Sequence, residues 1–157
     1  IENEKVLAAI RGVFALQNSA KKDSREDELR QRLRYILSQL GMSGERGTQD
    51  IIDACCFVRE HGGTGSSSGI RALCMALCPD APKSTEQRMR RAIERSLRHI
   101  ASLGLEDYTN EVFVRYATHL FPFEEVRREM AAIQGRGRGG HVSVKTFLDG
   151  LMVLLDD

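Results

Sequence analysis

Residues 84–103 restrict the fold of this chain most, because their side chains divide into an apolar face and a basic face at helical spacing. At 100° per residue, the two sets fall on different sides of one helix. The apolar face is formed by Met89, Ala92, Ile93, Ser96, Leu97 and Ile100. The basic face is formed by Arg88, Arg91, Arg95 and Arg98. We expect Ser84 or Thr85 to cap this helix and Gly104 to end it.

The rest of the chain is predicted to be helical as well. Apolar residues recur at the helical period, no segment alternates as a strand does, and the 157 residues include only three prolines. A short helix over 70–77 precedes a turn that contains Pro79 and Pro82, which forbid a continuous helix. We therefore expect an all-α multi-helix bundle that contains a helix-turn-helix motif.

Three segments are expected along the chain. Residues 1–41 are predicted to form a helical hairpin, with helices over 2–17 and 24–40 and a polar break at 18–24. Such a hairpin often forms dimers or receives a signal. Alternatively, its two helices complete the same hydrophobic core as the other helices of the chain. Residues 42–133 are predicted to hold the helix-turn-helix domain. Residues 134–157 are predicted to form a mobile, basic, glycine-rich loop and a C-terminal helix.

Net charge and hydropathy exclude several classes of protein. The formal net charge is +1, so any basic surface must be local, and residues 83–98 hold six Lys or Arg against two Glu. No run of about 20 apolar residues and no secretory leader is present, so we expect a cytoplasmic protein without a membrane partner. The segment Gly62–Gly69 is predicted to be a solvated connection.

No feature of the sequence predicts an enzyme, a metal site or a cofactor. The four cysteines, Cys55, Cys56, Cys74 and Cys78, lie in apolar stretches, which is typical of reduced and buried thiols. The four histidines are scattered, and no pattern of nucleophile and base is readable.

The basic face predicts that helix 84–103 enters the major groove of double-stranded promoter DNA. Guanidinium groups bind phosphate and guanine bidentately, and a carboxylate accepts from the amino group of cytosine. The leading contacts are Arg88, Arg91 and Arg95. The remaining predicted DNA-binding residues are Lys83, Thr85, Arg90, Glu94 and Arg98. A homodimer through the N-terminal or the C-terminal helices is a further expectation.

Several short motifs resemble those of a known family. In helix 84–103 the matching positions are Thr85, Arg88, Met89, Arg91, Ala92, Ile93, Leu97 and Gly104. Outside it the matching stretches are Leu40-Gly41, Gly47, Leu77-Cys78-Pro79-Asp80 and Thr109-Asn110-Glu111-Val112-Phe113. Over roughly residues 37–122 the chain resembles the C-terminal DNA-binding effector domain of the stage-zero sporulation response regulator, the sporulation initiation factor of endospore-forming Firmicutes.

This resemblance implies a helical domain that binds promoter DNA, often as a tandem dimer downstream of a phosphorylated receiver domain. Arg90 stands where that family has a glutamate, and Glu94 stands where it has an arginine, so the target sequence is expected to differ. The alternative is a non-enzymatic interaction module whose basic face pairs with an acidic protein.

Overall fold

The computed structural model describes residues 2–61 and 69–156, which contain seven helices and no strand. The prediction of an all-α bundle is confirmed. Of the predicted connection Gly62–Gly69, residues 62–68 lie outside the described residues, and Gly69 is the first residue of α3. The helices are α1 (Glu2–Gln39), α2 (Arg46–His61), α3 (Gly69–Leu77), α4 (Pro82–Glu106), α5 (Glu111–Tyr116), α6 (Phe123–Ile133) and α7 (Val144–Asp156).

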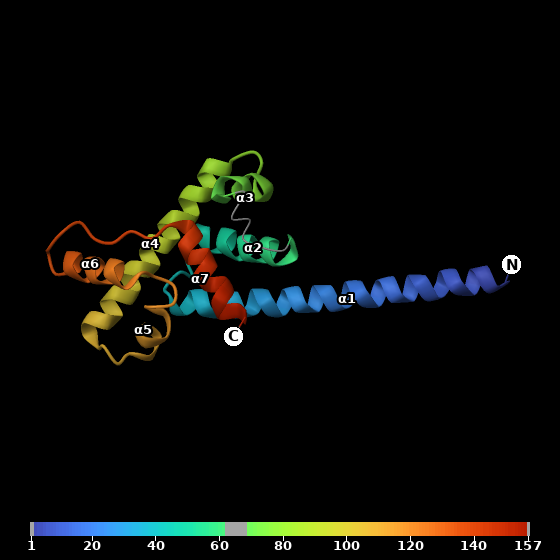
Figure 1. Ribbon diagram of the computed structural model, residues 1–157, viewed down its shortest axis with the longest axis horizontal. Helices are drawn as coiled ribbons and strands as arrows, with labels where there is room; N and C mark the ends of the chain where they lie inside the picture. The colour runs from blue at the N-terminus through green and yellow to red at the C-terminus, as the bar shows by residue number, and fades with distance from the viewer. Residues whose placement is uncertain (1, 62–68, 157) are drawn as a thin grey trace.

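Helix α4 is the centre of the bundle. Helices α2, α3, α5, α6 and α7 all pack against it (Figure 1). Its inward face carries Met89, Ile93 and Ile100, each with no exposed surface. Because the apolar face predicted for residues 84–103 is the buried one, the prediction of which side of this helix meets the core is confirmed.

The ends of α4 differ from the prediction. The helix begins at Pro82, its N-cap is Ala81, and no side chain caps it. Proline suits a first helical position because its fixed φ and missing N–H cost nothing there, so the predicted cap at Ser84 or Thr85 is wrong. Gly104 does not end the helix either. A Cβ at Gly104 would lie 2.3 Å from the Phe113 ring, so this glycine makes room for α5.

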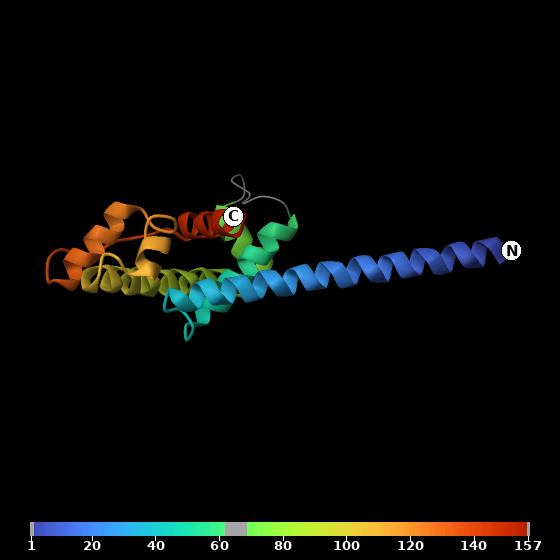
Figure 2. The ribbon, with the colours of Figure 1, turned by 90° about the horizontal axis from the view of Figure 1, so that it is seen from below.

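The predicted N-terminal hairpin is wrong, because residues 2–39 form one continuous helix (Figures 1 and 2). Residues 18–24 are polar but contain neither proline nor glycine, so nothing in them interrupts helical hydrogen bonding. The predicted end at Gly41 is confirmed. Gly41 has a φ of 76°, and the Met42 N–H donates to the Leu37 carbonyl, which is a Schellman end.

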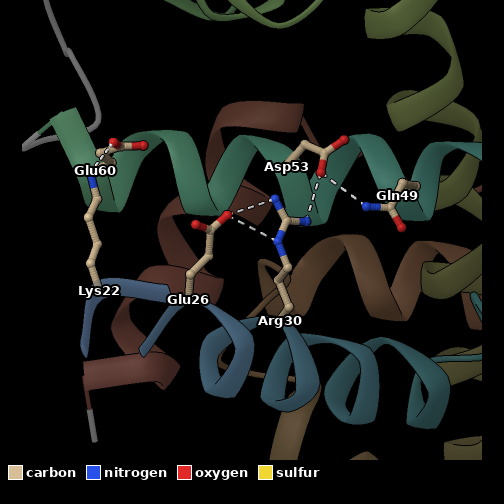
Figure 3. Close-up of polar contacts among 6 residues, drawn as sticks. All are labelled: Lys22, Glu26, Arg30, Gln49, Asp53 and Glu60. Atoms are coloured by element: carbon tan, nitrogen blue, oxygen red, sulfur yellow. Dashed lines mark hydrogen bonds and ion pairs between the residues drawn. The ribbon is translucent and has the colours of Figure 1, made fainter. Parts of the chain in front are cut away.

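Polar contacts fasten the middle of α1 to α2 (Figure 3). Lys22 pairs with Glu60 at 2.7 Å, and Arg30 pairs with both Glu26 and Asp53. Leu33 and Leu37 of α1, and Leu40 just after it, are fully buried in the same core as α4 and α7. The second half of α1 therefore belongs to the bundle, whereas its first half projects beyond it (Figure 2). The predicted division into three segments stays a prediction.

Two hydrogen bonds from backbone N–H groups attach the end of the segment between α6 and α7 to α6, and the mobility expected of residues 134–140 stays a prediction. The Gly140 N–H donates to the Glu129 carboxylate, and the His141 N–H donates to that of Glu125. Helix α7 then crosses the bundle with Phe147 and Leu151 fully buried. Arg32 of α1 donates to the last carbonyls of α7, where a cation suits the helix dipole.

No helix in residues 2–61 and 69–156 is both long enough and apolar enough to cross a membrane.

The prediction of reduced, largely buried cysteines is confirmed. All four are free, Cys55, Cys56 and Cys74 are buried, and Cys78 is half-buried in the turn after α3. Burial raises the pKa of Cys55 to about 12 and that of Cys74 to about 11. Few thiolates therefore form at these positions at neutral pH, and the thiolate is the reactive form.

We expect a thiol reagent such as Ellman's to modify Cys78 quickly in the folded chain at pH 8. The other three thiols should react only when the chain unfolds, since burial both covers them and raises their pKa values. Counting thiols with and without denaturant tests this. Fast reaction of all four in the folded chain would contradict the expectation.

Candidate nucleic-acid interface

The outward face of α4 carries most of the residues predicted to bind DNA. Lys83, Arg90, Arg91, Glu94, Arg95 and Arg98 are exposed, Arg88 is half-buried, and Thr85 is buried. Thr85 has no exposed surface, and its hydroxyl donates to the Ala81 carbonyl at 3.1 Å. A buried side chain cannot touch DNA, so Thr85 leaves the predicted contact set.

Arg88 joins α4 to α2. Its Nε donates to Asp50 Oδ2 at 2.8 Å, its Nη2 donates to Asp50 Oδ1 at 3.2 Å, and Nη2 also donates to the Thr85 hydroxyl at 3.1 Å. The hydrogen bonds to Asp50 raise the pKa of Arg88. The guanidinium is thus used in holding two helices together, and a leading role in DNA contact does not fit this arrangement.

Arg95 and Arg90 also have acidic partners, but both remain exposed. Arg95 pairs with Glu45 in the turn before α2, and its side chain is 68% exposed. Arg90 pairs with Glu86 one helical turn away, at 3.2 Å. Exposed pairs of this kind contribute at most about 1 kcal/mol, so a phosphate can compete with either carboxylate.

Arg91 and Arg98 are the exposed arginines of α4 for which the described residues provide no ion pair. They lie two helical turns apart, about 10 Å along the axis. Gln87 and Glu94 occupy the same stripe at spacings of three and four, and both are exposed. The stripe Gln87, Arg91, Glu94 and Arg98, which we call the outer stripe, therefore presents two cations, one amide and one carboxylate to solvent.

Gln87 also lies on this exposed stripe, although it was not among the residues predicted to bind DNA. Its position one turn before Arg91 was the available signal. An amide side chain is chemically suited to DNA, since glutamine reads adenine bidentately in the major groove.

The elements before α4 have the order of a helix-turn-helix. Helix α3 packs on α4, and a four-residue turn, 78–81, joins them. The Ala81 N–H closes that turn on the Cys78 carbonyl at 3.2 Å. Gly47 lets α2 approach α4 from another side, since a Cβ there would lie 2.0 Å from the Arg88 carbonyl oxygen. Helix α4 is thus held on its inner side and open on its outer stripe.

Residues 32–151 match the YcbB domain family, which is three quarters of the chain. The chain belongs to the YcbB domain family. The match begins in the second half of α1 and ends within α7, so the YcbB domain includes the whole of α2 to α6 and the complete outer stripe. The projecting first half of α1 lies outside it.

A curated relative supports a link to transcription. The "Transcriptional regulatory protein GlnL" of Bacillus subtilis (strain 168) is 32% identical over 126 residues, which are 65% of this chain and 38% of the relative. The chain thus spans about two fifths of that relative's length. No solved structure matches. The family is the YcbB domain, not the sporulation regulator's effector domain suggested by the motifs, and the common ground is similarity to a transcriptional regulator.

Proposed function

We propose that this YcbB domain is a sequence-specific DNA-binding module of a transcriptional regulator, and that α4 enters the major groove through its outer stripe. The observation that carries the proposal is the pair Arg91 and Arg98, two turns apart, exposed, and without an ion pair among the described residues. Similarity to a protein named as a transcriptional regulator supports it.

In this proposal the arginines of α4 divide into two groups. Arg91 and Arg98 contact guanine edges or phosphates, Gln87 reads an adjacent base, and Glu94 accepts from a cytosine amino group. Arg88 instead positions α4 against α2 through Asp50. Arg90, Arg95 and Lys83 lie on the flanks, where they neutralise phosphates without reading sequence. In this proposal the module acts in the cytoplasm and uses neither a cofactor nor catalysis.

The test is retention of a labelled random-sequence duplex pool at several salt concentrations. The wild-type chain should enrich a defined motif, and its affinity should fall steeply with salt because bound counterions are released. We expect Arg91→Ala/Arg98→Ala to weaken binding by about 100-fold or more, since each good bidentate contact contributes about 1–3 kcal/mol.

A matched control separates contact from net charge. Arg127→Ala/Arg128→Ala removes two positive charges from exposed positions of α6, outside the outer stripe. This variant should keep the enriched motif and lose little affinity. An equal loss of DNA affinity in both variants would mean that binding depends only on unspecific charge attraction. If the wild-type chain retains no DNA even at low salt, the proposal is overturned.

The second candidate is a non-enzymatic protein-interaction module. Three arginines of α4 already bind carboxylates within the chain, at Asp50, Glu86 and Glu45. The same face therefore suits an acidic partner segment. This candidate would be favoured if the folded chain does not bind DNA at low salt but binds an acidic peptide through Arg91 and Arg98.

A further inference from the structure

The projecting half of α1 carries an exposed apolar stripe. Its five side chains, here called the α1 stripe, are Val6, Leu7, Ile10, Val13 and Phe14, with exposed fractions of 57%, 53%, 47%, 54% and 61%. They recur at spacings of three and four, so they lie on one side of the helix. A continuous exposed apolar stripe is typical of a helix that packs against a partner.

Nothing in residues 2–61 and 69–156 covers this stripe. The inward face is formed further along by Leu33 and Leu37 of α1 and by Leu40 just after it. At 100° per residue that face is turned by roughly two fifths of a revolution from the α1 stripe. The α1–α2 ion pairs start at Lys22, and the helix before it projects away from the bundle (Figure 2). A straight α1 cannot present both faces to one core.

We propose that the α1 stripe pairs with the same stripe of a second copy, in a parallel two-stranded coiled coil over residues 3–20. The heptad that fits the stripe places Val6 and Val13 at d positions and Ile10 at an a position. The seam is about 27 Å long. Both bundles then lie at the same end of the coiled coil.

Charge placement makes this seam self-complementary. The charged residues within 3–20 are Glu4, Lys5 and Arg11, and all three fall at b or c positions, on the outer side. The e and g positions that flank the seam hold Leu7, Phe14, Ala9 and Leu16 instead. Two copies therefore approach without bringing like charges together.

Two features select a parallel, in-register pair. Asn3 and Gln17 occupy a positions, where each faces its own counterpart and their amides hydrogen-bond across the seam, whereas an antiparallel pair buries them against apolar side chains. A parallel pair also sets Phe14 at e beside Ala9 at g of the second copy, so a large side chain meets a small one. This inference stands independently of DNA binding.

The first test is the oligomeric state of the full chain, measured by sedimentation over a concentration series without DNA. We expect a reversible dimer, and Ile10→Glu should turn it into a monomer because the substitution places a carboxylate in the seam. The matched control is Ala15→Glu, which adds the same charge at an f position, on the outer side. It should leave the dimer intact.

Circular dichroism and thermal unfolding check that both variants are still folded. Both should keep the unfolding transition of the bundle. A wild-type chain that stays monomeric up to millimolar concentration would overturn the inference and leave the stripe to a different protein. A dimer that survives Ile10→Glu would overturn it as well.

The second test reads the orientation. Under oxidised glutathione, Gln17→Cys should give a disulfide-linked dimer, since the two residues face each other in a parallel seam. Ala15→Cys should not exceed the wild-type background. Failure of Gln17→Cys to cross-link in a chain that still dimerises would overturn the parallel arrangement.

Discussion

Replacing Gly47 by alanine is expected to destabilise the bundle by about 3 kcal/mol, in the upper range for overpacking of a core. The new Cβ would lie 2.0 Å from the Arg88 carbonyl oxygen and 2.5 Å from the carbonyl carbon. Both atoms are backbone of α4, so neither can rotate away as a side-chain end can. The two helices must separate, and the Arg88–Asp50 pair next to the contact is strained with them.

The sign of this effect is diagnostic. Alanine is intrinsically the better helix residue by roughly 1 kcal/mol, so propensity alone predicts stabilisation at a helical glycine. The control is Gly44→Ala, three residues earlier, where a Cβ would meet nothing within 4 Å. Urea unfolding of both variants decides the matter. A neutral or stabilising Gly47→Ala would mean that α2 and α4 are further apart than in this structure.

Replacing Phe147 by alanine is expected to cost about 3–5 kcal/mol, the range for removing a buried aromatic side chain. Phe147 has no exposed surface, and its ring centre lies 5.8 Å from that of Phe121. The substitution leaves a cavity where α7 packs against the bundle. Since small domains are stable by only about 5–15 kcal/mol, much of the total is lost.

The control for this prediction is Phe123→Ala at the start of α6. Its side chain is 46% exposed, so its removal leaves little cavity, and a loss below about 1 kcal/mol is expected. Thermal or urea unfolding of both variants tests the contrast. Similar losses at the two positions would show that α7 is not part of the cooperative core.

The sequence was sufficient wherever one local pattern settled the outcome. The apolar period of residues 84–103 identified the inward face of α4, and Gly41 identified the end of α1, because a left-handed residue is needed there and glycine adopts that conformation easily. The helical conformation of residues 2–17 was predicted as well. In each case the determining residues lie within one or two helical turns of one another.

The sequence misled where two local signals competed. Residues 18–24 looked like a break because they are polar, yet polar residues without proline or glycine continue a helix on the solvent side. Gly104 looked like a helix end because glycine often follows the last turn. Here it is buried within α4, since the Phe113 ring needs the space that a Cβ would fill.

The division of the arginines was decided only by the tertiary structure. The sequence places Arg88, Arg91, Arg95 and Arg98 on one face, and Arg88 was ranked among the leading contacts while Arg98 was not. Packing of α2 against α4 brings Asp50 to Arg88 and Glu45 to Arg95, from 38 and 50 residues away. The chain by itself thus determined a helical bundle with one basic helix. Long-range contacts decided which arginines stay free to bind a partner. Helical periodicity describes a single helix, whereas these ion pairs join α4 to residues outside it.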